Sequence, residues 1–322
     1  MTASAGSGKS NGVNASPRES WKSLYPFQGN AMLYRGHRLH YLDEGRGEPL
    51  LMLHGNPTWS FLFRDLVRGL RPTYRCIVPD YIGCGLSDKP GDEAYVYTLE
   101  SRLQEVEALL EHLQLGDHLT LIAHDWGGLI GTACVLRRPE RFRRVVLMNT
   151  AAFLRPAGKR IPWRLRLARR RGPVSDLLVR RLNLFCHGAA RLATAQGLSP
   201  QVRAGLLAPY DSFANRIAIQ RFVQDIPLGP GDRSYALTRW VDENLHRLVG
   251  LPVLICWGRR DFVFDEPILR EWQRRLPSAE YAIYPDAGHY LLEDVGGAVL
   301  EVVRRFLTGH PPTPLVSGSG GP

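Results

Sequence analysis

The chain has 322 residues, of which 44% are hydrophobic, and it carries a formal net charge of +10. This length and apolar content are enough to bury a large core, which excludes a fibrous or wholly disordered chain. No apolar run approaches the roughly 18 residues of a membrane-spanning helix, and no charged segment followed by an apolar one opens the sequence. We therefore expect a globular, cytoplasmic protein without an integral membrane segment.

Both ends of the chain differ in composition from the rest. Residues 1–20 and 311–322 are rich in Ser, Gly and Pro and poor in large apolar side chains. Such segments cannot offset the entropy lost on ordering. We predict that both ends are disordered.

Much of the positive charge falls in residues 159–181, which hold nine Lys or Arg residues against one acid, Asp176. No recognised nucleic-acid module or interleaved aromatic platform accompanies this charge, so we expect no nucleic-acid partner. The segment is interpreted as a solvated helix face, with an acidic partner or an anionic ligand as the alternative.

The sequence predicts neither a metal nor a cofactor. Five cysteines are scattered without C-x-x-C spacing or a nearby His, which is typical of free thiols in a reducing compartment. The GSGKS sequence near the start lacks the first glycine and the preceding strand of a phosphate-binding loop.

Apolar runs of strand length recur along the chain. They read RLHYLD, PLLMLHG, YRCIVPD, HLTLIAHD, RVVLMNT, PVLICWG and AEYAIYP. From the third run onward the spacers mostly have helical periodicity, as in LESRLQEVEALLEHLQL. This alternation predicts an α/β fold with a mostly parallel sheet covered by helices on both faces. The first two runs lack a helical connector, so we expect them to form an antiparallel edge.

The alternation stops after Asn149 and resumes at Leu251. The intervening residues are Arg-rich, helical in pattern and interrupted by seven prolines. We expect a helical cap, residues 151–247, inserted into a core of residues 21–150 and 248–310. Such a cap would cover the strand ends at which open sheets bind ligands.

The sequence LIAHDWGGLIG places one carboxylate, Asp125, between an apolar strand and a turn containing glycine. A nucleophile elbow needs small residues two positions before and after the exposed side chain, and Ala123 and Gly127 satisfy this spacing. A serine there must lose a proton before attack, whereas Asp is already ionised near neutral pH. The pattern predicts a nucleophilic Asp125, with a helix N-cap as the alternative.

Two later motifs complete a catalytic set in the expected order. CWGRRD places Asp261 after one strand, and DAGHYLLED places His289 after the last. The order nucleophile, acid, histidine is typical of this arrangement. We expect Asp261 to orient His289, which would activate water against an ester formed on Asp125.

Three further acids lie near these motifs. We expect Asp265 to begin the helix EPILREWQRRL as its cap, close to Pro267. Asp286 and Glu293 flank the histidine and are expected to face solvent.

Two donors flank the predicted nucleophile. Asn56 follows the strand PLLMLHG, and Trp126 follows the elbow residue. Their amide and indole N–H groups would converge on a leaving halide or a carboxylate oxygen. A primary haloalkane, an epoxide or a strained lactone each suits such a site. An epoxide would favour paired cap tyrosines, for which Tyr210 and Tyr235 are candidates.

The motifs HGNPTWS, HDWGG, GRRD and GHYLLED resemble those of the haloalkane dehalogenase group of α/β-hydrolases over about residues 25–308. Within this group, YPF, IVPDYIGCGLSDKP, MNTAAF and APYDSFANRIAIQRFVQDIPL are most similar to the β-lactone decarboxylases of bacterial long-chain olefin biosynthesis. The resemblance implies an α/β-hydrolase fold that converts a long-chain cis-β-lactone to a cis-alkene and carbon dioxide. It also implies assembly with other enzymes of that pathway, including the β-lactone synthetase.

Residue by residue, the resemblance places the nucleophile at Asp125, the base at His289 and the acid at Asp261. The polar-oxygen or halide site falls on Asn56 and Trp126. Asp125 would attack either the lactone carbonyl or the alkyl carbon, and both options stay open.

Haloalkane dehalogenation is the main alternative. Ordinary dehalogenases typically have Pro-Phe-Pro where this chain has Pro209-Tyr210-Asp211, which counts against that activity. An epoxide hydrolase and a catalytically idle binding protein are the remaining alternatives.

A substrate with two alkyl chains would need an apolar tunnel. The cap offers candidate lining residues, namely Trp163, Leu165, Leu167, Leu177, Leu178, Leu182, Leu184, Phe185, Phe213 and Phe222. The alternative role of these side chains is to form the cap's own core.

Overall fold

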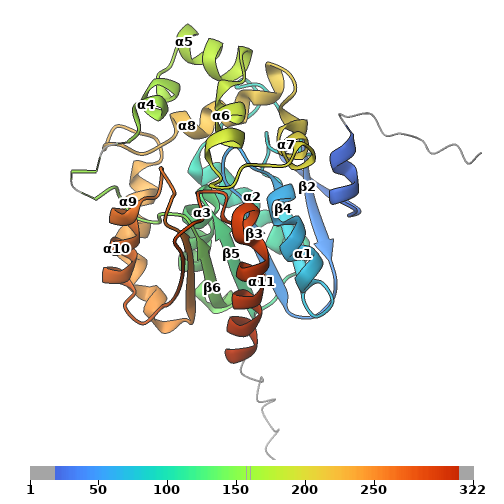
Figure 1. Ribbon diagram of the computed structural model, residues 1–322, viewed down its shortest axis with the longest axis vertical. Helices are drawn as coiled ribbons and strands as arrows, with labels where there is room; N and C mark the ends of the chain where they lie inside the picture. Colours follow the sequence, from blue (N-terminus) through green and yellow to red (C-terminus); the bar gives the residue numbers. More distant parts are fainter. Residues whose placement is uncertain (1–18, 157, 160, 312–322) are drawn as a thin grey trace, which may run out of the picture.

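The computed structural model describes residues 19–156, 158–159 and 161–311, and within these ranges the centre of the molecule is one eight-stranded sheet (Figure 1). Its spatial order is β1-β2-β4-β3-β5-β6-β7-β8. The strands are β1 (Asn30–Tyr34), β2 (His37–Glu44), β3 (Pro49–Leu53), β4 (Arg75–Pro79), β5 (Leu119–His124), β6 (Phe142–Met148), β7 (Val253–Gly258) and β8 (Glu280–Tyr284).

The sheet is parallel from β4 to β8 and antiparallel at the β1–β2 edge, where β1 pairs with β2 and β2 pairs with β4. The prediction that the first two apolar runs form this edge is wrong in detail. β2 does lie near the edge, but its hairpin partner is β1, and β3 lies inside the sheet between β4 and β5. The physical reason is burial: β3 buries four consecutive apolar residues, as is typical of an interior strand whose two faces are both covered, whereas β1 buries only Met32 and Tyr34.

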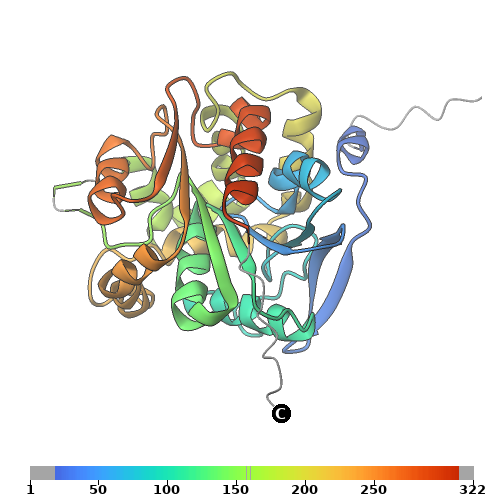
Figure 2. The ribbon, with the colours of Figure 1, turned by 90° about the horizontal axis from the view of Figure 1, so that it is seen from below.

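Helices cover both faces of this sheet (Figure 2). The faces are set by alternation along each strand: Leu50 and Met52 of β3 belong to one buried cluster, and Leu51 and Leu53 belong to the other. The first cluster includes residues of α1 (Arg64–Leu70) and α11 (Leu291–Gly309). The second includes residues of α2 (Leu99–His112), α3 (Trp126–Arg137), α9 (Tyr235–Asn244) and α10 (Glu266–Arg275).

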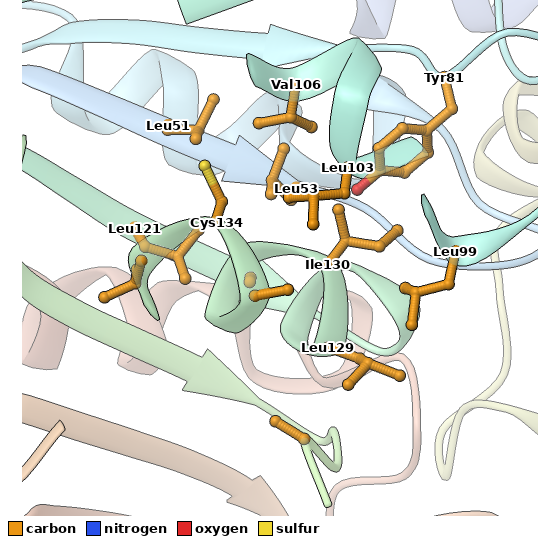
Figure 3. Packing of buried hydrophobic residues seen from close by; sticks show 14 of the residues in the cluster. Leu51, Leu53, Tyr81, Leu99, Leu103, Val106, Leu121, Leu129, Ile130 and Cys134 are labelled. Carbon is orange, nitrogen blue, oxygen red and sulfur yellow. The ribbon is translucent and has the colours of Figure 1, made fainter. Parts of the chain in front are cut away.

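The second cluster fixes the helix that follows the predicted nucleophile. Figure 3 shows Leu53 of β3 beside Leu103 of α2 and Ile130 of α3, with Leu51 further back along the same strand, and all four are fully buried. Burying these side chains contributes roughly 1.5–3 kcal/mol each. The start of α3, and with it Asp125, is therefore held by packing on the sheet.

The helices between β6 and β7 form the inserted cap, for which we propose the bounds 151–247. Besides α9, they are α4 (Trp163–Arg169), α5 (Pro173–Ser175), α6 (Leu184–Leu192), α7 (Pro200–Leu207) and α8 (Ile217–Gln224). Figure 1 shows α4, α5, α6 and α8 above the sheet, at the end away from the C-terminal end of α11. Short helical turns complete the structure, namely η1 (Ser20–Leu24), η2 (Ser60–Phe63), η3 (Pro139–Arg141), η4 (Asp176–Arg181), η5 (Ala208–Tyr210), η6 (Ala214–Arg216) and η7 (Leu245–Gly250).

Within the described part of the chain, no helix is both long and apolar enough to cross a membrane. The five cysteines are buried and form no disulfide. The two segments predicted to be disordered lie outside the described residues, except for their inner ends, where Ser20 begins η1.

Candidate active site

The elbow between β5 and α3 holds Asp125 in an unusual backbone conformation, with φ 53° and ψ −128°. Small neighbours make this turn possible. A Cβ on Gly127 would lie 2.0 Å from the carbonyl oxygen of Leu53, and one on Gly55 would lie 2.4 Å from the Asp125 Cβ. The alternative role as a helix cap is also realised, because the Asp125 carboxylate accepts a hydrogen bond from the backbone N–H of Trp126. The same turn both begins the helix and presents the carboxylate.

Three predicted residues from distant parts of the chain meet at this elbow. His289 Nε2 lies 3.1 Å from Asp125 Oδ2, and His289 Nδ1 lies 2.8 Å from Asp261 Oδ2. All three side chains are buried, with 7% or less of each residue exposed. The imidazole therefore bridges two carboxylates in surroundings with little water.

The orientation of Asp261 is fixed from several directions. Its Oδ1 accepts hydrogen bonds from the backbone N–H groups of Val263 (2.7 Å) and Phe264 (3.0 Å). Its Oδ2 also accepts from Asn149 Nδ2 at 2.9 Å. Asn149 is in turn tied to Gly258, donating to its carbonyl at 3.0 Å and accepting from its N–H at 2.8 Å. The sequence reasoning assigned no role to Asn149.

Two further polar residues position the backbone of the site, and both were missed in the sequence. His124 Nε2 donates to the carbonyl oxygen of His289 at 2.8 Å, and Thr150 Oγ1 donates to the carbonyl oxygen of Asp125 at 2.6 Å. Burial lowers the pKa of His124 to about 4, so its ring is neutral at pH 7. The signal available in the sequence was position: His124 precedes the predicted nucleophile, and Thr150 stands at the end of an apolar strand run.

The charges of the site favour a protonated His289. Burial opposes its positive charge, but the attraction of Asp261 and the hydrogen bond to Asp125 outweigh burial and raise its pKa to about 10. In the resting site, His289 is therefore a cation between two carboxylates, and it can act as a base only once the charge of Asp125 has been neutralised.

The two predicted donors, Asn56 and Trp126, border the same space as Asp125. Asn56 Nδ2 donates to the carbonyl oxygen of Ile219 in α8 at 3.1 Å, which fixes the orientation of the amide, since its oxygen could not face that carbonyl. One amide N–H is left for a ligand. The Trp126 ring packs on Phe222 of α8 with a centroid separation of 5.4 Å, and within the described residues its Nε1 has no hydrogen-bond partner. Both donors therefore contact the cap.

A cavity of about 1000 Å³ lies between the elbow and the cap. Its lining is mainly apolar, and Asn56, Asp125, Trp126 and His289 supply polar groups at the elbow. Asp261 lies behind His289 and does not border the cavity. A space of this size accommodates a small apolar molecule with chains attached.

The proposed tunnel lining is correct for six of the ten candidates. Trp163, Leu165, Leu167, Leu178, Leu184 and Phe185 border the cavity. Leu177, Leu182 and Phe213 are instead exposed on the cap, and Phe222 is fully buried against the Trp126 ring, with the Arg102 guanidinium over its own ring. The helical pattern alone did not distinguish the inner from the outer face of the cap.

The tyrosines that an epoxide would require do not border the cavity. Tyr210 is fully buried, and its hydroxyl donates to the carbonyl oxygen of Thr58 at 3.1 Å. Tyr235 begins α9 and is likewise not part of the lining. This arrangement removes the support for an epoxide hydrolase.

Of the three other acids, Asp286 lies as predicted, Glu293 does not, and Asp265 does so only in part. Glu293 does not face solvent: it forms a bidentate ion pair with Arg64 at 2.6 and 2.7 Å, because α11 packs against α1. Asp286 is exposed, as expected. Asp265 stands at the N-cap of α10 but makes no side-chain capping bond, because its carboxylate pairs with Lys159.

An acid at the elbow of this fold and a histidine that bridges two carboxylates define a class of enzyme. The chain belongs to the alpha/beta hydrolase fold family, whose model matches residues 48–294. Among curated proteins, it is 45% identical to a cis-3-alkyl-4-alkyloxetan-2-one decarboxylase of Shewanella oneidensis, over 89% of this chain and 90% of that one. It is 32% identical to haloalkane dehalogenase 2 of Mycobacterium tuberculosis, over 88% of this chain and 96% of that one. The solved structure of the haloalkane dehalogenase DatA from Agrobacterium tumefaciens superposes with a TM-score of 0.78 at 24% identity, covering 88% of this chain and 97% of that one.

Among the described residues, no group of three or more His, Cys, Asp or Glu side chains could hold a metal ion.

Proposed function

We propose that this protein is a β-lactone decarboxylase, which converts a long-chain cis-3-alkyl-4-alkyloxetan-2-one to a cis-alkene and carbon dioxide. The observation that carries the proposal is the 45% identity to a decarboxylase of that substrate class over nearly the whole chain. The contacts among Asp125, His289 and Asp261, together with the apolar cavity above them, are consistent with it.

In the first step we propose, the ionised carboxylate of Asp125 attacks the ring carbon that bears the 4-alkyl chain. The bond from that carbon to the ring oxygen breaks, and the ring opens to a carboxylate and an ester on Asp125. Attack comes from the side opposite the departing oxygen, so the carbon is inverted. No proton has to be removed from the nucleophile, because an Asp carboxyl is ionised near neutral pH.

In the second step, the new carboxylate leaves as carbon dioxide. The electron pair of its C–C bond forms the alkene, and the ester bond to Asp125 breaks to regenerate the carboxylate. Inversion followed by loss of the two groups from opposite sides keeps both alkyl chains on the same side. This sequence accounts for a cis-alkene and consumes no water.

His289 has an electrostatic role in this scheme. As a cation hydrogen-bonded to Asp125 Oδ2, it orients the nucleophile and stabilises the carboxylate when it departs from the ester. The free amide N–H of Asn56 and the indole N–H of Trp126 would bind the carboxylate released from the ring.

The direct test supplies purified protein with a synthetic long-chain cis-β-lactone and measures alkene by gas chromatography. We expect alkene from the wild type and at least about 10³-fold less from an Asp125→Asn variant, which keeps the size of the side chain but removes its charge. Absence of alkene from folded wild-type protein would contradict the proposal.

Haloalkane dehalogenation is the second candidate, supported by the 32% identity to a curated dehalogenase over 88% of the chain. Attack on a haloalkane also gives an ester on Asp125, but there water must cleave it. Once Asp125 carries no charge, the pKa of His289 falls, and its Nε2 can then activate water. Halide release from primary bromoalkanes faster than lactone turnover would favour this candidate.

We also propose a cytoplasmic location and assembly with other enzymes of olefin biosynthesis, including the β-lactone synthetase. Five buried cysteines without disulfides agree with a reducing compartment. Copurification of tagged protein from its native host, with the captured enzymes identified by mass spectrometry, tests the assembly.

A further inference from the structure

Several large apolar side chains that border the cavity also remain open to solvent, which marks its mouth. Trp163, Leu184, Leu192 and Phe262 all border the cavity, yet their exposed fractions are 69%, 51%, 47% and 45%. We call these four residues the rim. Exposed apolar groups gathered around an opening mark a surface that meets a partner or a membrane.

Positive charge predominates beside the rim. Apart from His289 at the elbow, four cationic residues among those that the structure describes border the cavity, namely Arg155, Lys159, Arg164 and Arg260, and the one carboxylate among the described lining residues is Asp125. Lys159 and Arg260 pair with carboxylates outside the lining. Within the described part of the chain, Arg155 and Arg164 form no ion pair.

Helix α4 extends this character outward. Trp163 and Arg166 lie three residues apart in α4, and Arg170, the C-cap residue at which the helix ends, follows four residues later, so the three lie on one side. All three are exposed, whereas Ala168, on the opposite side, is buried in the cap. We call these three residues the outer face of α4; it combines an aromatic ring with two cations and has no acid.

We propose that the rim and the outer face of α4 dock onto the surface of an anionic lipid bilayer. Aromatic and leucine side chains insert at the boundary between headgroups and acyl chains, while arginines reach the phosphates. The net charge of +10 adds a long-range attraction of the same sign. An acidic protein would also suit the charge, but the exposed apolar side chains that border the cavity favour a fluid apolar phase.

Docking in this orientation would place the cavity mouth against the bilayer. An apolar substrate could then enter the cavity without crossing water. This consequence rests on the proposed function, whereas the docking does not. The docking itself involves none of the three elbow residues, so it can be measured on protein without activity.

The test is flotation of full-length protein with vesicles of phosphatidylcholine, with and without phosphatidylglycerol. We expect binding at least about tenfold tighter to the anionic vesicles, since each basic residue near such a surface contributes about fivefold. Binding should weaken as salt shortens the screening length from about 10 Å at 0.1 M to about 3 Å at 1 M.

Matched charge variants locate the surface. Arg166→Gln with Arg170→Gln should weaken binding about 25-fold, because two of these contributions are lost. The control removes the same charge from Arg138 and Arg247, which are exposed at the C-terminal end of α3 and in η7, at the end of the strands away from the elbow. The control should change binding less than about twofold.

The apolar part is tested separately by Trp163→Ser. This variant should weaken binding while leaving its salt dependence unchanged, because the arginines remain. Absence of binding to anionic vesicles at low salt would overturn the proposal and favour an acidic protein partner. Equal losses in the two double variants would overturn the assignment to this surface.

Discussion

Asn149 and His289 hydrogen-bond to the same oxygen of Asp261, Oδ2, at 2.9 and 2.8 Å. Asn149 lies directly after β6, and Asp261 lies three residues after β7, so the contact joins two neighbouring strands of the sheet. The other oxygen, Oδ1, accepts hydrogen bonds from the backbone N–H groups of Val263 and Phe264. Rotating the Asp261 carboxylate away from its observed orientation would therefore break at least one hydrogen bond. Asn149 thus sets the direction in which Asp261 holds the imidazole.

We predict that Asn149→Ala lowers kcat for alkene formation by up to about 100-fold, because the imidazole loses its fixed direction. KM should change little, since Asn149 does not border the cavity. Asn183→Ala is the control, because Asn183 also has a positive φ (53°, against 36° for Asn149) but hydrogen-bonds within the cap. An equal fall in kcat for both variants would assign the effect to backbone strain.

The second prediction separates the two candidate reactions. With His289→Gln, a bromoalkane should stop after one turnover, leaving an ester on Asp125 that mass spectrometry detects, because no base is present to activate water. Lactone turnover should fall but continue over many cycles, since its second step needs no water. Accumulation of an ester from the lactone would contradict the proposed second step.

The third prediction concerns stability and pH. The pKa of His289 is raised from 6.5 to about 10 in the folded protein, so the folded state binds this proton more tightly than the unfolded state. The resulting stabilisation is fully present below about pH 6.5 and is lost as the pH rises toward 10. The difference in the free energy of unfolding between wild type and His289→Gln, from denaturant titrations, should therefore shrink over this range. A constant difference would show that no such proton is bound.

The fourth prediction concerns the tight elbow. Gly127→Ala should destabilise the protein by about 1–3 kcal/mol or more, since its Cβ would meet the Leu53 carbonyl at 2.0 Å and the rigid strand cannot yield. Gly188→Ala in α6 is the matched control, because a Cβ there meets nothing within 4 Å. That control should raise the free energy of unfolding by roughly 0.5–1 kcal/mol, as expected for alanine within a helix. Thermal unfolding of both variants provides the comparison.

The sequence was most informative where a function depends on a short stretch of chain. The elbow around Asp125 needs small residues at fixed positions, and the loops carrying Asp261 and His289 each follow a recognisable apolar strand. The order of these motifs, together with the alternation of apolar strands and helical spacers, was therefore enough to predict the fold and the meeting of the three residues.

Contacts between distant elements were not accessible in this way. The role of Asn149 depends on the register that pairs Met148 with Cys256, and nothing local to Asn149 indicates that register. Glu293 was misassigned for a similar reason, since its partner, Arg64, lies on another helix. The inner and outer faces of the cap were confused because its short helices carry apolar residues on both sides.

Both donors at the elbow rest on one cap helix, α8, through the carbonyl of Ile219 and the ring of Phe222. Asn56 and Trp126 belong to the core, yet their orientations are set by a segment more than 90 residues further along the chain. The cap is therefore more than a cover that selects substrates by shape. If the cap were exchanged for that of a relative, the new cap would set the orientations of two hydrogen-bond donors that belong to the core.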